Sequence, residues 1–195
     1  EDRRAHEREI AQALAVARTL SAMRVQELIL GLRGSPERIA LAGRVPTDGS
    51  AGLSESQWRA LADGIHALAA ACEPLGVRLA VHPHAGSYVE TREELDRLLH
   101  GTNPPALGLC VDAGHLVYGG ADPVEVVKTF GSRVRYVHIK DVNPDVLAEC
   151  QGQGVGFLDA LQRYIFCGLG KGSVNLAGFV EGLRQAAFAG WMVIE

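Results

Sequence analysis

The sequence predicts an α/β fold in which helices cover a parallel sheet. Five short runs are apolar almost throughout, and they begin at Val25, Val77, Leu107, Val134 and Trp191. Between them lie segments with helical character, most of them about ten residues or longer. Strands that are apolar on both faces belong to sheets buried on both sides, and parallel neighbours need long connections. Both observations favour a parallel sheet over an antiparallel one.

The first helix is expected over residues 3–22, because Ile10, Leu14, Ala17 and Leu20 recur there at helical spacing. The apolar run VQELILGL follows as the first strand. A polar segment rich in Gly and Pro then reads as a loop that leads to the second helix.

Three later helix starts carry a capping signal. Two have a Ser or Thr followed three residues on by Gln or Glu, as in a capping box, and one has Asp directly before Pro at the first helical position. The three expected N-cap residues are Ser54, Thr91 and Asp122. Each of these helices is followed by one of the apolar strands.

The last part of the chain contains a longer helical and loop region over about residues 144–173, a final helix over about 176–188, and the strand WMVIE. A closed (β/α)₈ barrel needs eight strands and usually about 250 residues. The five strands therefore fit either the larger C-terminal part of a barrel or an open doubly wound sheet. No GxGxxG opens a helix after the first strand, so the dinucleotide-binding version of the open sheet has little support.

Composition favours a single globular domain, residues 1–195, that acts on a small molecule. The chain is 47% hydrophobic and 22% charged, with a formal charge of −4 and a pI near 6.0. This balance argues against nucleic acid as a partner. The four cysteines form no CxxC pair, and no apolar run approaches the roughly 20 residues that span a bilayer. We expect a cytoplasmic protein without membrane contact, and a chain that lacks an initiator Met and stops after a strand is expected to be part of a longer one.

Polar side chains that can bind metals or substrates follow four successive strands. The carboxyl ends of parallel strands form the active-site face of α/β folds, so these side chains are expected to converge. The residues at the strand ends are His82, His84, Asp112, His138, Lys140 and Glu195.

Mixed imidazole and carboxylate ligands suit Mn²⁺, Co²⁺, Fe²⁺ or Zn²⁺. The spacing between these residues is long and forms no compact motif, so plainer interpretations stay open. Asp112 could cap a turn before Ala113 and Gly114. Lys140 and Asp141 could form a solvated strand exit.

Several segments together resemble the sugar phosphate isomerase/epimerase family of xylose isomerase-like TIM barrels, and within it the inosose dehydratase branch. The resemblance covers about residues 3–195 and is strongest from residue 77 onward. It implies a (β/α)₈ TIM barrel, of which this chain resembles roughly strands four to eight. The segments that carry it are AVHPHAGSYVET, GLCVDAGHLVYGGADP, VHIKDV, FCGLGKGSVNL and GWMVIE.

The resemblance implies a divalent metal held by one residue from each of four strands. Carried over by motif, the ligands are His82, Asp112, His138 and Glu195, with Mn²⁺ or Co²⁺ expected first and Zn²⁺, Fe²⁺ or Mg²⁺ as alternatives. His115 of the DAGH motif would contact substrate oxygens. Ketose epimerases of this superfamily have Glu at the first ligand position, and His82 here favours the dehydratase branch.

The expected reaction starts from an α-hydroxy ketone and passes through an enediolate. Glu195 or a metal-bound water is the candidate base, while Lys140, His115 and His84 are candidates for stabilising the oxyanion or protonating a leaving hydroxyl. The segment GLGKGS, residues 168–173, lacks the first Gly and the spacing of a P-loop, so we expect a flexible loop whose Lys171 binds substrate.

The expected partner is a keto-sugar or keto-cyclitol, and a homo-oligomer fits the family. Inosose dehydration leads, with a ketose 3-epimerase or sugar isomerase as the near alternative. Two other classes remain: an apurinic endonuclease-like DNA repair enzyme with three zinc ions, and a non-catalytic sugar-binding barrel. Loss of a β-hydroxyl would give dehydration and return of the proton would give isomerisation, and the sequence does not choose between them.

Overall fold

The main sheet contains five parallel strands in the order β1-β2-β3-β4-β7. This computed structural model describes residues 3–195, with side chains described from Glu7 onward. A doubly wound sheet reverses its strand order at a switch point, whereas these strands follow chain order, as in a segment of a (β/α)₈ barrel. The open-sheet alternative is therefore wrong. The strands are β1 (Glu27–Gly31), β2 (Arg78–His82), β3 (Gly108–Asp112), β4 (Val134–Ile139) and β7 (Trp191–Ile194).

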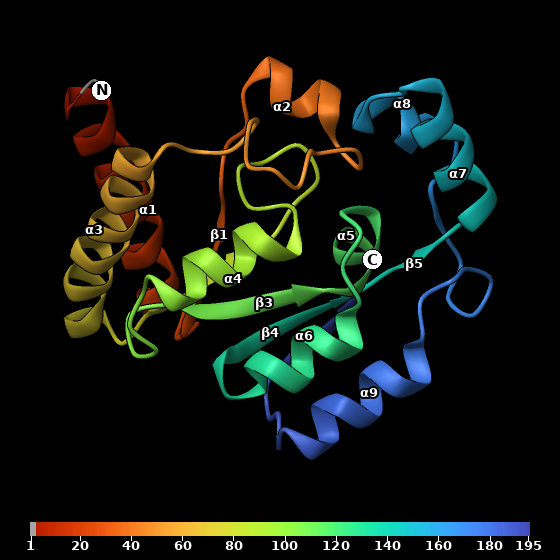
Figure 1. Ribbon diagram of the computed structural model, residues 1–195. Helices are drawn as coiled ribbons and strands as arrows, with labels where there is room; N and C mark the ends of the chain where they lie inside the picture. Colours follow the sequence, from red (N-terminus) through yellow and green to blue (C-terminus); the bar gives the residue numbers. More distant parts are fainter. Residues whose placement is uncertain (1–2) are drawn as a thin grey trace.

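Two pairs of helices pack together beside the sheet, α1 against α3 and α6 against α9, whereas α2, α5, α7 and α8 lie past the ends of the strands (Figure 1). A two-stranded antiparallel sheet, β5 (Asp141–Val142) with β6 (Phe166–Cys167), lies past the end of β4. The helices are α1 (Arg3–Ala22), α2 (Pro36–Leu41), α3 (Glu55–Cys72), α4 (Arg92–His100), α5 (Ala113–Tyr118), α6 (Pro123–Phe130), α7 (Pro144–Gln153), α8 (Phe157–Gln162) and α9 (Leu176–Gln185). Single 3₁₀ turns follow α3 (Glu73–Leu75) and α6 (Gly131–Arg133).

The capping predictions are confirmed. Ser54 and Thr91 each accept from the backbone three residues on and complete a capping box, and Asp122 accepts from Val124 N. One expected loop contains a helix instead: α2 begins after Ser35, whose hydroxyl accepts from Arg38 N. A helix of six residues is too short to show helical periodicity in the sequence.

Sheet register sets the positions of the polar strand ends. Asp112 at the end of β3 lies opposite His138 of β4, and Gly31 of β1 lies opposite His82 of β2. The amide of Glu195 donates to Ile139 O at 3.1 Å and so extends the pairing of β4 with β7. The polar side chains therefore reach one end of the sheet. Among the described residues, no helix is long and apolar enough to cross a membrane.

Candidate metal centre and substrate site

Asp112 lies at the centre of the polar cluster and is fully buried. Its Oδ1 accepts from His115 N at 3.0 Å and caps α5, while its Oδ2 faces the cluster. Oδ2 accepts from Lys140 Nζ at 2.6 Å and lies 3.1 Å from His82 Nε2 and 3.3 Å from His138 Nδ1. Burial alone would raise the pKa of Asp112, but His138, His82 and Lys140 hold it well below its ordinary value. The carboxylate is thus ionised.

His138 shows the feature that best fits a metal. Its Nδ1 is buried without a hydrogen-bond partner, yet it lies 3.3 Å from Asp112 Oδ2 and 3.4 Å from Glu195 Oε2. Ligand atoms bound about 2.0–2.2 Å from one metal stand about 3–3.5 Å from each other. Asp112, His138 and Glu195 therefore form a donor set with the separations that a divalent cation requires.

His82 also lies in the cluster, beside Asp112. It groups with Asp112 and His115, and separately with Cys110 and His138, but in no described group does it join Glu195. The structure thus brings three of the four predicted ligands together and places the fourth beside Asp112. Cys110, which the sequence did not single out, lies beneath the cluster, and burial raises the pKa of its thiol.

Lys140 lies in the cluster and is only 8% exposed. Its Nζ donates to Asp112 Oδ2 and Glu195 Oε2. Burial would lower the pKa of Lys140, but these two carboxylates raise it above its ordinary value. The solvated strand exit is therefore wrong, because Lys140 is a fixed cation on the two carboxylates of the candidate metal group.

His84 and His115 form a stacked pair of rings, with centroids 3.9 Å apart and planes inclined by 34°. Burial lowers the pKa of both and brings that of His115 to about 2, which favours the neutral form of each ring. Ala85 N donates to His115 Nδ1, which leaves the ring proton on Nε2. His84 Nδ1 contacts Ala85 O at 2.9 Å and must donate there, so its Nε2 carries the lone pair. The pair offers one donor and one acceptor to substrate hydroxyls.

Two aromatic rings that the sequence did not single out lie against these groups. Phe157 of α8 lies 5.4 Å from the ring of His115 and 5.5 Å from that of His84. Phe166 of β6 lies 5.3 Å from the ring of His115, and Lys140 Nζ stands 5.7 Å from its centroid. An aromatic residue in a short run carries no sequence signal for this role.

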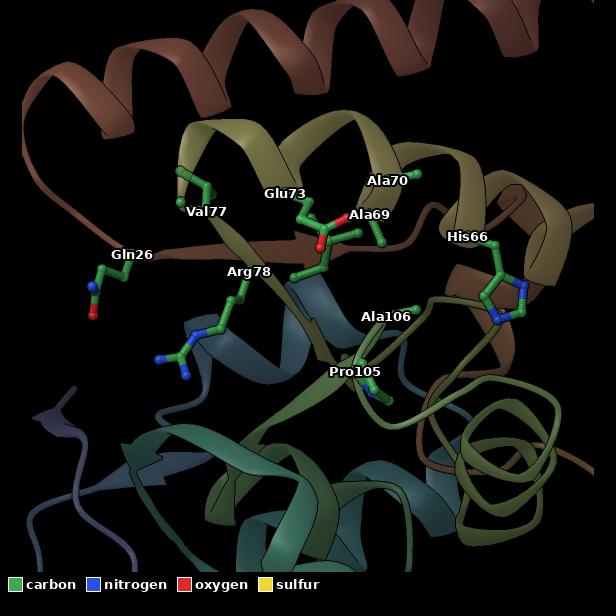
Figure 2. Close-up of a pocket in the computed structure, with 11 residues that line it drawn as sticks. Gln26, His66, Ala69, Ala70, Glu73, Val77, Arg78, Pro105 and Ala106 are labelled. Atoms are coloured by element: carbon green, nitrogen blue, oxygen red, sulfur yellow. The ribbon is translucent and has the colours of Figure 1, made fainter.

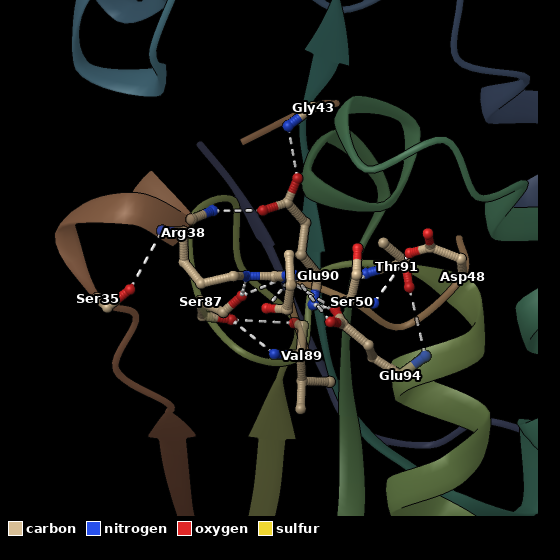
Figure 3. Close-up of polar contacts among 12 residues, drawn as sticks. Ser35, Arg38, Gly43, Asp48, Ser50, Ser87, Val89, Glu90, Thr91 and Glu94 are labelled. Carbon is tan, nitrogen blue, oxygen red and sulfur yellow. Dashed lines mark hydrogen bonds and ion pairs between the residues drawn. The ribbon is translucent and has the colours of Figure 1, made fainter. Parts of the chain in front are cut away.

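A buried polar network holds the loop that carries His84 (Figure 3). Glu90 is 1% exposed and accepts from Gly43 N and Gly86 N, both at 2.5 Å. Burial raises the pKa of Glu90, and the two amides oppose this rise. Arg38 also donates to Ser87 O at 2.7 Å. The network ties the loop after β2 to the segment around α2.

Lys171 is exposed on the loop of residues 168–173, and the described contacts do not join it to the cluster. Substrate binding by Lys171 stays a prediction. The loop itself is not free to cradle a phosphate, because Gly170 N and Gly172 N both donate to Asp141.

A hollow of about 510 Å³ lies at the other end of the sheet, where the strands begin (Figure 2). Its lining includes Gln26, Val77, Arg78 and Ala106, which precede or start β1, β2 and β3. It contains none of the predicted site residues, and active sites of β/α barrels lie at the carboxyl ends of the strands.

The sequence profile of the xylose isomerase-like TIM barrel family matches residues 1–195. The chain belongs to this family. The barrel expectation from the sequence is thereby confirmed, and the five parallel strands form part of a (β/α)₈ barrel.

Curated relatives in the xylose isomerase-like TIM barrel family are named inosose dehydratase. The protein from Geobacillus kaustophilus (strain HTA426) is 40% identical over 143 residues, which cover 73% of this chain and 46% of the relative. The protein from Clostridium perfringens (strain ATCC 13124) is 31% identical over 179 residues, which cover 90% of this chain and 59% of the relative. The chain thus spans about half the length of these relatives.

Solved structures show the same fold. The IolI protein with a bound zinc atom matches all of this chain and 62% of its own, with a TM-score of 0.71 and 18% identity. The probable 3-DHS dehydratase AsbF from Bacillus anthracis matches 97% of this chain and 64% of its own, with a TM-score of 0.72 and 17% identity. D-allulose 3-epimerase from Methylomonas sp., in complex with D-allulose, covers 95% of this chain and 56% of its own, with a TM-score of 0.64 and 18% identity.

Proposed function

We propose that the protein is a divalent-metal-dependent lyase that dehydrates a keto-cyclitol. The name of its relatives, inosose dehydratase, supports this reaction. The observation that carries the proposal is the orphaned Nδ1 of His138, which faces two carboxylate oxygens at the carboxyl end of the sheet. This donor set suits a divalent cation, and these strand ends are where β/α barrels bind substrates.

Asp112, His138 and Glu195 would hold the metal, with His82, which lies beside Asp112, as the fourth ligand. The nitrogen and oxygen donors suit Mn²⁺ or Co²⁺, with Zn²⁺, Fe²⁺ and Mg²⁺ as alternatives. The zinc atom bound in the IolI structure supports a metal in a protein of this fold. When bound, the metal would polarise the substrate carbonyl and make the neighbouring C–H more acidic, which favours an enediolate.

The side chains around the cluster supply the remaining steps. Glu195 is 41% exposed in its side chain, so it can reach substrate, and it would take the proton from the carbon beside the carbonyl. Lys140, whose ammonium lies in the same cluster, would give a proton to the departing β-hydroxyl, which leaves as water. His115 would donate a hydrogen bond to a substrate oxygen through Nε2, and His84 would accept one from a hydroxyl.

An epimerase or isomerase is the near alternative, and the D-allulose 3-epimerase fold supports it. Epimerisation by two glutamates would need a second Glu where the chain has His82. Among the described donor groups, the one that contains Glu195 has no second glutamate, since its other members are Asp112 and His138. The arrangement favours elimination over return of the proton.

The test is incubation of the purified protein with an inosose and Mn²⁺, Co²⁺ or Zn²⁺, followed by the absorbance of the dione product. We expect the absorbance to rise only with metal. Exchange of the substrate C–H in D₂O without dione would instead identify an isomerase or epimerase. Elemental analysis separates the other classes, because about three zinc ions would indicate an endonuclease-like site and no metal a non-catalytic barrel. A homo-oligomer and a cytoplasmic location stay predictions.

A further inference from the structure

Asp141 is fully buried, and both of its carboxylate oxygens accept backbone N–H groups. Oδ1 accepts from Val142 N at 2.9 Å and from Val174 N at 3.0 Å. Oδ2 accepts from Gly170 N and Gly172 N, each at 2.9 Å. These amides outweigh burial and lower the pKa of Asp141. Three of the four donors come from a loop about 30 residues further along the chain.

The loop is shaped to close around this carboxylate. A Cβ on Gly172 would overlap Asp141 Oδ1 and Val142 O, so only glycine lets the two segments approach. Gly170 has φ +79°, a conformation that side chains disfavour. Ser173 N donates to Val142 O at 2.9 Å. The loop therefore has one defined position, and Asp141 sets it.

The same contacts connect the loop to the substrate site. Asp141 and Val142 form β5, which pairs with Phe166 and Cys167 of β6. Successive side chains on a strand point to opposite faces, so Lys140 faces the metal cluster while Asp141 faces the loop. Phe166 in turn lies against Lys140 and His115.

We propose that Asp141 is a positioning residue: by anchoring residues 166–174 it fixes the ring of Phe166 as an apolar wall beside Lys140 and His115. The wall would pack against the non-reacting C–H face of a cyclic substrate and select ring-shaped polyols over open-chain ones. The choice of substrate rests on the proposed function, whereas the anchoring of the loop does not.

The test compares Asp141→Asn with Phe166→Leu, the double variant, and Asp159→Asn as a matched control on the exposed face of α8. An asparagine keeps the shape but turns an NH₂ toward backbone N–H groups. We expect Asp141→Asn and Phe166→Leu each to raise KM for the inosose about tenfold, with kcat within about twofold. Because both substitutions act through the ring of Phe166, the KM of the double variant should be no higher than that of either single variant.

Two readouts do not depend on turnover. Hydrogen exchange of residues 168–174 should speed up in Asp141→Asn but not in Phe166→Leu or Asp159→Asn, and Zn²⁺ binding measured by calorimetry should stay unchanged in all three. If Asp141→Asn does not fold, Gly172→Ala pushes the loop off the same carboxylate and should give the same exchange and KM changes. The proposal would be overturned if residues 168–174 of Asp141→Asn exchanged at the wild-type rate, or if the two KM effects were additive in the double variant. Absence of inosose turnover in the wild type would refute the proposed function alone, since the exchange comparison still tests the anchor.

Discussion

Replacement of Lys140 by Met tests whether the ammonium and the metal compete for the same oxygens. Met is unbranched and one atom shorter than Lys, and it removes both the charge and the hydrogen-bond donors of the ammonium. In the structure Nζ donates to Asp112 Oδ2 and Glu195 Oε2, which are two of the three donors in the candidate metal group. A metal that binds both oxygens must displace the ammonium. We therefore expect Lys140→Met to bind metal more tightly while it loses turnover.

The size of the effect follows from the bonds that metal binding would break. A hydrogen bond to a charged group contributes roughly 1.5–3 kcal/mol, and every 1.4 kcal/mol is about a factor of ten in affinity. The displaced ammonium of Lys140 finds new partners in water, so about one such bond is lost in net terms. The metal dissociation constant should fall about ten- to hundredfold. Without metal, loss of the ammonium from the buried carboxylate of Asp112 should cost the variant roughly 3 kcal/mol of stability.

The assay is calorimetric titration with Zn²⁺ and thermal unfolding with and without the metal. Lys128→Met is the matched control, because Lys128 is exposed on α6 and contacts only Glu125 at 3.5 Å among the described ion pairs. We expect the metal to raise the melting temperature more in Lys140→Met than in the wild type. Equal or weaker Zn²⁺ affinity in Lys140→Met would refute the reasoning, because the ammonium would then not occupy the metal position.

Three further predictions concern the cluster and its supports. His138→Ala should weaken metal binding at least about a hundredfold, and full occupancy by elemental analysis would show that it is no ligand. Gly114→Ala should cost about 1–3 kcal/mol in urea unfolding, because the new Cβ would stand 2.5 Å from Lys140 Cβ; an unchanged midpoint contradicts this. Arg38→Met should cost about 3–5 kcal/mol by leaving the buried carboxylate of Glu94 without its cationic partner, and a loss below about 1 kcal/mol would contradict the role of that pair.

The strands and most helix starts could be predicted because their signals are local. Ser54 and Thr91 each predict a helix start from a motif of four residues, and apolar runs predict buried strands. The convergence of Asp112, His138 and Glu195 also follows from sequence, since parallel strands end on one side of the sheet. Short helices such as α5 give no periodicity, so they were not predicted.

The rest depends on contacts between distant segments. The supporting roles of Glu90 and Asp141 have no signal in the sequence, because their partners are backbone amides, which nearly every residue has. Glu90 accepts from Gly43, 47 residues earlier, and Asp141 accepts from Gly172, 31 residues later. Phe166 is likewise defined only by its position against Lys140. Chemistry carried by side chains can be recognised in a sequence, whereas support from the backbone needs coordinates.

The two interpretations of Asp112 turn out to be one arrangement rather than alternatives. The sequence suggested either a turn cap or a metal ligand, and the structure gives Oδ1 the first role and leaves Oδ2 for the second. Because Oδ1 is held by His115 N, the carboxylate cannot rotate, and Oδ2 stays aimed at His138 and Lys140. Gly114, which lies between Asp112 and His115 in the chain, leaves the space that Lys140 fills. The DAGH segment thus orients the carboxylate, admits the lysine and supplies the imidazole, so replacement of any one of these residues should disturb the positions of the other two.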